Sequence, residues 1–358
     1  MTARRMPGLK PGPPGMRTRY SAGVRSLHAT CWMAEALPAT IDRAALVHAL
    51  AALGVPRGGL VMVHSSLRSL GAVDGGANTV VAALLESLGP EGTLVAPAFT
   101  YPVAKHPGFA FDPANTPSCM GAISDAVRRH PAARRSLHLN HSVAAIGPLA
   151  AALTTAQAWT TESPIGQVIG RAGHFLLLGV PYQNLTAMHF MEVALGVPYR
   201  TSGSMSGRLR LPDGSLGELV SHVTPSRSGH VGSDYNRIGQ ALDDAGVVAI
   251  GAVGNALARL VAGSEVRDAC AAYYARDPLA FVRKNGALTR LTRGHAVDTA
   301  RGTLCVVDPA RIYVPTLTPL RQASALEPRQ TDPDGGQSAH NETRTPTHDS
   351  SPQRLGRD

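Results

Sequence analysis

The chain has 358 residues, 44% of them hydrophobic and 16% charged, with a formal net charge of +9 at pH 7. This composition is typical of a globular protein with a sizeable core and excludes disorder of the whole chain. No apolar run approaches the ~18 residues of a membrane-spanning helix, so we expect a soluble protein. The 4 cysteines are scattered, without the paired spacing of a zinc or redox motif, which favours a reducing cytoplasm.

The positive charge is concentrated near the N-terminus. Residues 1–32 hold six Arg or Lys and no Asp or Glu, whereas residues 321–358 are nearly balanced. The remaining charge is spread over residues 33–320 without a basic, aromatic-rich stripe, so nucleic-acid binding is not expected. Both ends are polar and rich in Pro or Gly, and we expect disordered extensions around a single domain at 33–320, with Met33 as a candidate true start.

Between the two ends, apolar strands alternate with helical patterns, which predicts an α/β fold. We expect three layers, with a central mixed β-sheet flanked by helices and a small β-hairpin subregion. The expected elements are a helix at 40–55 capped by Thr40 and closed at Gly54, a strand at 60–67, a helix at 77–89, strands at 92–100 and 173–180, a helix at 184–196, a hairpin at 208–223 with a PDG turn, and a helix, a strand and a helical end at 239–275.

The apolar helix predicted at 184–196 carries two ionisable residues, His189 and Glu192. Positions i and i+3 share one helix face, so both side chains can project together. An imidazole beside a carboxylate can act as a general base near neutral pH. Two other interpretations remain open from the pattern alone: a hydrogen-bonded structural pair, or half of a carboxylate metal site, although such sites carry the motif twice.

Seven segments in the same order resemble the aminoglycoside 3-N-acetyltransferase family, whose members use acetyl-CoA and are distinct from the GCN5-related acetyltransferases. The resemblance covers about residues 40–285. It is carried by VHSSLRSLG at 63–71, GPEGTLVAPAFTYP at 89–102, FDPANTPSCMG at 111–121, RRSLHLNHSVAAIG at 134–147, ESPIG at 162–166, LLLGVPYQNLTAMHFMEVALGVPYR at 176–200 and SDYNRIG at 233–239.

This resemblance implies acetyl transfer from acetyl-CoA to the 3-amino group of a 2-deoxystreptamine aminoglycoside, hence antibiotic resistance. His189 would be the general base, and Glu192 its electrostatic partner or a ligand of the substrate's ammonium groups. Thr186, one turn earlier, would offer its hydroxyl to the thioester oxygen. Transfer is expected to be direct, because GxSxG is absent and no Ser or Cys lies in the context of an activated nucleophile.

The acetyl donor is expected to lie against the first strand and its turn, where glycines allow close approach to a helix N-terminus. The expected cofactor-binding residues are His64, Ser65, Ser66, Leu67, Gly75, Gly76 and Ser142. The expected substrate ligands are Glu162, Asp234 and Asn184. No metal is expected.

Several departures from the family pattern leave alternatives open. Leu139 follows His138 where the family usually has proline, and Ala187 and Met191 differ from the usual residues around His189. The acceptor could therefore be a non-antibiotic amine, or the chain could be a catalytically silent protein that binds CoA or a partner. The oligomeric state is left open, with a homodimer as one option.

Overall fold

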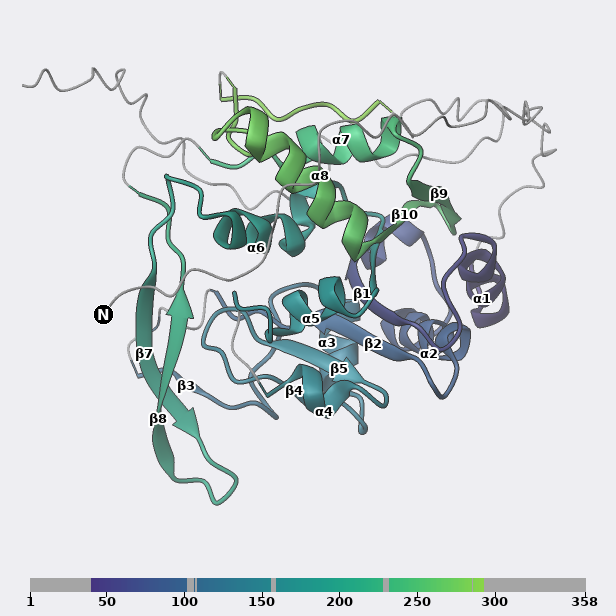
Figure 1. Ribbon diagram of the computed structural model, residues 1–358. Helices are drawn as coiled ribbons and strands as arrows, with labels where there is room; N and C mark the ends of the chain where they lie inside the picture. Colours follow the sequence, from purple (N-terminus) through teal and green to yellow (C-terminus); the bar gives the residue numbers. More distant parts are fainter. Residues whose placement is uncertain are drawn as a thin grey trace, which may run out of the picture. The chain divides into compact units, whose positions relative to one another are not determined.

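A seven-stranded mixed sheet forms the centre of the fold in the computed structural model (Figure 1). The structure describes residues 40–101, 106, 108–155, 159–227, 232–284 and 286–292, all of which belong to one compact unit. The expected extensions at 1–32 and 321–358 and the start at Met33 lie outside the described residues, so the domain limits remain a prediction. No helix among the described residues is long and apolar enough to span a bilayer.

The sheet has the strand order β4-β5-β2-β1-β6-β10-β9. Strand β1 runs parallel to β2 and β6, whereas the outer strands pair antiparallel with their neighbours. The strands are β1 (Leu60–Ser65), β2 (Thr93–Pro97), β4 (Arg134–Arg135), β5 (Val143–Ile146), β6 (His174–Leu178), β9 (Val248–Val253) and β10 (Ala256–Ala262). The mixed α/β prediction is confirmed.

Helices cover both faces of this sheet because its central strands are apolar on both sides. On β1, Val61 and Val63 pack under α1, α2 and α3, whereas Leu60 and Met62 point to the opposite core, which α5, α6, α7 and α8 cover. The helices are α1 (Arg43–Ala52), α2 (Gly76–Leu88), α3 (Ala122–Arg129), α4 (Ala150–Leu153), α5 (Pro164–Gly170), α6 (Thr186–Leu195), α7 (Tyr235–Asp244) and α8 (Gly263–Arg276). The result is the expected three-layer arrangement.

A second, three-stranded sheet contains the predicted hairpin. It consists of β3 (Ala110–Phe111), β7 (Gly203–Arg210) and β8 (Leu216–Val223), in the order β3-β7-β8. The PDG turn closes the hairpin with Gly214 at φ +84°. On its inner face, Leu219 packs against Phe111 and Leu139, which attaches the hairpin to the segment between β4 and β5.

Two predictions about individual elements are wrong: the start of the first helix and the number of strands in the region 239–275. Helix α1 begins at Arg43 with Asp42 as its N-cap, whose carboxylate accepts a hydrogen bond from the Ala45 N–H at 2.8 Å, so Thr40 is not the cap. Ile41 instead forms a β-bridge with Val73. In the region 239–275, the structure has two strands, β9 and β10, where one was expected.

Strand β10 was missed because its sequence, ALARLVA, is rich in good helix formers. Its pairing with both β6 and β9 supplies backbone partners that outweigh local propensity.

Candidate active site

Helix α6 and the turn after β1 meet beyond the carboxyl-terminal ends of the parallel strands β1 and β6. Strand β6 leads through a short 3-10 turn, η3 (Tyr182–Asn184), into α6. The Nε2 atom of His64, near the end of β1, lies 3.1 Å from the Thr186 Oγ1 atom and 3.3 Å from the Thr186 backbone nitrogen. This contact joins the predicted cofactor turn to the first residue of the helix that carries His189.

Glu192 accepts hydrogen bonds from five side chains of the described residues. It is fully buried, and its Oε2 atom lies 3.0 Å from His189 Nδ1. The remaining donors are Arg200 through Nε at 2.7 Å and Nη2 at 2.6 Å, the Tyr235 hydroxyl at 2.8 Å, the Tyr199 hydroxyl at 3.0 Å and the Ser233 hydroxyl at 3.0 Å. These contacts leave no room for a substrate ammonium, so they favour Glu192 as partner of His189 over Glu192 as substrate ligand.

The charge state of this pair follows from its surroundings. Burial raises the pKa of the Glu192 carboxyl, but the His189 hydrogen bond and the Arg200 charge outweigh burial and hold that pKa below its usual value. An ionised carboxylate only accepts hydrogen bonds, so the Nδ1 atom of His189 carries the proton. The lone pair of the imidazole is therefore on Nε2.

The His189 side chain is a neutral imidazole at neutral pH. Burial lowers the pKa of His189, the hydrogen bond to Glu192 raises it in part, and the Arg200 charge lowers it again, with a net result below the ordinary value. Its Nε2 atom lies 3.1 Å from the Thr224 Oγ1 atom, just beyond the end of β8. A neutral ring with its lone pair on Nε2 is the form a general base requires at neutral pH.

Aromatic rings enclose the other sides of His189. The Trp159 ring meets it edge-on at a centroid distance of 4.2 Å, and the His141 ring lies 6.3 Å away. Tyr101 packs edge-on against His141 at 4.9 Å. Trp159 has φ 75°, a left-handed conformation that is uncommon for a residue with a side chain and that clusters at functional sites.

The predicted cofactor turn carries a cluster of polar groups. His64 and Ser65 each have a buried polar atom, Nδ1 and Oγ respectively, with no partner among the described residues. Burial lowers the pKa of His64 to about 4, so this ring is neutral. Ser66 instead caps the turn η1 (Leu67–Leu70), accepting from the Ser69 hydroxyl at 2.9 Å, and Leu67 packs against the α1–α3 core.

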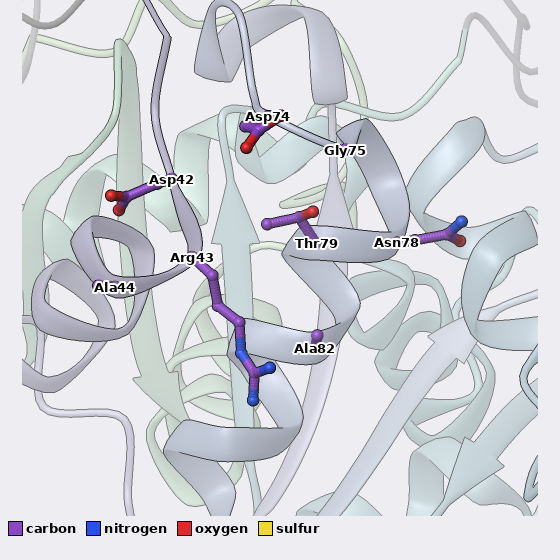
Figure 2. A pocket seen from close by; sticks show the side chains of 8 residues that line it. All are labelled: Asp42, Arg43, Ala44, Asp74, Gly75, Asn78, Thr79 and Ala82. Atoms are coloured by element: carbon purple, nitrogen blue, oxygen red, sulfur yellow. The ribbon is translucent and has the colours of Figure 1, made fainter.

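Gly75 and Gly76 lie at the N-terminus of α2, with φ +68° and +61°. Gly75 lines a hollow of about 520 Å³ between α1 and α2, shown in Figure 2. Its lining includes Asp42 and Asp74, and the lining cation Arg43 is ion-paired with Glu86 at 2.5 Å. This acidic lining disfavours a phosphate. The hollow also lies on the α1–α2 side of the sheet, opposite the layer that contains His189.

The four other predicted residues are Ser142, Asp234, Glu162 and Asn184. The Ser142 hydroxyl is fully buried, donates to the Ala98 carbonyl at 2.8 Å and accepts from Arg135, so its contacts are structural. Asp234 is buried and accepts from the Thr289 N–H at 3.0 Å and its hydroxyl at 2.7 Å. The contacts of Ser142 favour a structural role. The two bonds of Asp234 are both to its Oδ2 atom, whereas its Oδ1 atom is buried without a partner among the described residues. Glu162 and Asn184 are exposed and keep their polar groups accessible.

Several residues that complete the site were not predicted from the sequence. Arg200, Ser233 and Tyr235 stand in segments that carried the family resemblance, VPYR and SDYNRIG, so their motifs were a usable signal. Thr224 and Trp159 stand outside those segments, and only the folded chain brings them to His189. Among the described residues, no group of three His, Cys, Asp or Glu side chains could hold a metal ion.

Comparison with known proteins gives the family. The family model described as aminoglycoside 3-N-acetyltransferase matches residues 62–275. Aminoglycoside N(3)-acetyltransferase III from Salmonella is 36% identical over 176 residues, which is 44% of this chain and 62% of that enzyme's length. The match thus spans less than two thirds of that relative. Aminoglycoside N(3)-acetyltransferase IV from Salmonella is 32% identical over 263 residues, covering 72% of this chain and 96% of the relative.

Solved structures agree with this match. A histidine-to-alanine variant of aminoglycoside acetyltransferase AAC(3)-IVa in complex with a gentamicin is 30% identical, with a TM-score of 0.58 over 68% of this chain and 92% of that one. AAC-VIa bound to sisomicin is 29% identical, with a TM-score of 0.59 over 66% and 98%. AAC-IIIb in binary complex with CoASH, at 23% identity and a TM-score of 0.58 over 66% and 97%, shares the fold. The chain belongs to the aminoglycoside 3-N-acetyltransferase family.

Proposed function

We propose that this protein transfers the acetyl group of acetyl-CoA to the 3-amino group of a 2-deoxystreptamine aminoglycoside, with His189 as general base. The observation that carries this proposal is the His189–Glu192 contact of 3.0 Å, in which a buried, ionised carboxylate leaves the lone pair on Nε2. An ammonium has no lone pair, so the acceptor must lose a proton before or while it attacks the thioester.

The turn after β1 is the proposed site of the thioester end of acetyl-CoA. Thr186 lies on α6 one turn before His189, on the same helix face. Its hydroxyl contacts His64, whose Nδ1 atom, like the Ser65 hydroxyl, has no partner among the described residues. Groups of this kind can donate to the carbonyl oxygen as charge develops on it. The CoASH complex of AAC-IIIb, which shares the fold, is consistent with this co-substrate.

The aminoglycoside assignment rests on family membership and on the gentamicin and sisomicin complexes of two relatives. Among the three predicted substrate ligands, Glu162 and Asn184 are exposed and remain candidates, whereas Asp234 is buried and has its Oδ2 atom bonded to Thr289. A polycationic drug would therefore rely on Glu162 more than on any buried carboxylate.

A second candidate function is acetylation of an amine that carries less charge than an aminoglycoside. The favouring observation is that both oxygens of the buried Glu192 already have donors, while the Trp159 and His141 rings lie beside His189. Such a surface suits an apolar or planar group beside the reacting amine better than a second ammonium.

The test is release of CoA thiol from acetyl-CoA, followed with gentamicin, sisomicin and simple monoamines as acceptors. Runs without amine correct for the exposed thiol of Cys119. Replacement of the base, His189→Ala, should lower turnover roughly 10²–10⁴-fold. The matched control is His48→Ala, which removes an exposed histidine on α1 and should leave turnover unchanged.

Three outcomes are informative. Turnover with the two drugs supports the proposal, and turnover with monoamines alone supports the second candidate. A His189→Ala enzyme that keeps most of its activity would show that another group takes the proton.

A further inference from the structure

Thr224 contacts the base nitrogen of the site. It lies one residue after β8, is only 7% exposed, and its Oγ1 atom is 3.1 Å from His189 Nε2. With Glu192 on Nδ1, the imidazole is therefore held at both ring nitrogens, by a carboxylate from its own helix and by a hydroxyl from the hairpin. Nothing in the local sequence around Thr224 marks it for this contact.

The end of the hairpin is anchored on both sides, which fixes where this hydroxyl stands. Arg200, the residue that binds Glu192, also donates through Nη1 to the Thr224 carbonyl at 3.1 Å. His138 Nε2 lies 2.9 Å from the His222 carbonyl, and the Leu139 N–H donates to the Ser221 hydroxyl at 3.0 Å. A proline at position 139 could not make the last bond, so the Leu139 departure from the family pattern contributes an anchor of its own.

The direction of the Thr224 hydrogen bond follows from the tautomer. Because Glu192 fixes the proton on Nδ1, Nε2 is an acceptor in the resting enzyme and the Thr224 hydroxyl donates to it. Nε2 has a single lone pair, so the Thr224 hydroxyl gives up this hydrogen bond when the acceptor amine approaches and its proton passes to Nε2. The hydroxyl can then rotate about its C–O bond and accept from the imidazolium. A single side chain can thus hydrogen-bond to both protonation states of the base.

We propose that Thr224 is a positioning residue of the acetyl transfer, holding the His189 ring in the plane in which Nε2 faces the acceptor amine, while Glu192 sets the tautomer. This inference rests on the proposed role of His189 as base. Thr224 acts through His189 and forms no bond to the acetyl group.

The charged and titratable groups that face His189 come from several elements. They are Glu192 on its own helix, Arg200 in the segment after α6, and His141 in the segment between β4 and β5. None of them accepts a hydrogen bond from Nε2 among the described contacts of this ring. Loss of the Thr224 hydroxyl therefore removes the acceptor that stabilises the imidazolium, and charge-assisted bonds are stronger than neutral ones. The base should then protonate at lower pH than in the native enzyme.

The test compares Thr224→Val, which keeps the shape and removes the hydroxyl, with Thr224→Ser, which keeps the hydroxyl. We expect the valine variant to lose roughly tenfold in kcat, as for one hydrogen bond, with KM changed by less than about threefold. The acidic limb of its kcat/KM profile should move to lower pH. The serine variant should restore both kcat and the position of that limb.

Thr224 is buried, so its replacement can destabilise the fold. The unfolding midpoints of both variants must therefore match that of the native enzyme before their activities are compared. If the valine variant is destabilised, Thr224→Ser and Thr224→Ala, compared at a temperature where both are folded, take its place. Native kcat in the valine variant, or a fall in kcat with an unmoved acidic limb, overturns the inference. Full activity of His189→Ala would instead overturn the proposed base, so failure of one proposal is distinguishable from failure of the other.

Discussion

The ion pair between Glu192 and Arg200 should dominate the stability of the site. Glu192 is fully buried and the Arg200 side chain is 13% exposed, with two short contacts of 2.6 and 2.7 Å between them. Removing one partner of such a pair leaves an uncompensated buried charge or a set of unmatched donors, which costs about 3–5 kcal/mol. We therefore expect Glu192→Gln and Arg200→Met each to lower the unfolding free energy by about that amount.

The double variant should lose less than the sum of the two single variants. In it, neither charge remains buried, and the methionine side chain can occupy the space of the arginine stem. The other hydrogen bonds of Arg200, which reach Thr224, Ser226, Ser233 and Tyr235, are lost in both Arg200→Met backgrounds and cancel in the double-mutant cycle. We expect a coupling energy of about 2 kcal/mol or more, toward the upper part of the range for residues in direct contact.

Urea unfolding measured by tryptophan fluorescence and by circular dichroism gives the four free energies. Coincident transitions from the two probes justify the two-state treatment. Additivity within about 0.5 kcal/mol would contradict the reasoning, because it would mean that the two charges do not depend on each other. A cost below about 1 kcal/mol for Glu192→Gln alone would also refute it.

Two further predictions concern the rest of the fold. Asp42→Ala should cost about 1 kcal/mol of unfolding free energy because it removes the α1 cap, whereas Thr40→Ala should cost close to nothing; thermal or urea midpoints separate the two. Burial lowers the pKa of His64 and of His138 to about 4, below the unfolded value near 6.5. The unfolded chain therefore binds protons first as the pH falls, and stability present above pH ~6.5 is lost progressively down to about pH 4. At pH 5 each histidine should contribute about 2 kcal/mol less stability than at pH 8, and equal urea midpoints at the two pH values would contradict this.

Most of the helices and strands could be predicted from the periodicity of apolar residues in the sequence. The strands at β1, β2 and β6, the helices α2 and α6 and the β7–β8 hairpin follow from apolar patterns, glycines and turn residues, all of which are local signals. Local signals predicted the wrong secondary structure where pairing with neighbouring strands determines it. Strand β10 lies between β6 and β9, and this pairing outweighs the helical propensity of ALARLVA.

The contact between His189 and Glu192 could also be predicted from the sequence, because an i, i+3 spacing on a helix brings two side chains together wherever the helix lies. The outcome differs for the predicted ligand Ser142, because its hydroxyl donates to the Ala98 carbonyl and accepts from Arg135. A carboxylate or hydroxyl in a promising motif is available to a ligand only if the fold leaves it without a partner.

The fold class, the family and the imidazole–carboxylate pair on α6 could all be predicted, since they depend on residue types and on spacings within single elements. The groups that complete the pair could not, because they come together only in the folded chain. Arg200, Thr224 and Trp159 reach His189 or Glu192 from three separate segments. Their convergence depends on how the hairpin and the sheet pack, and contacts between segments far apart in a chain leave no periodic trace in its sequence.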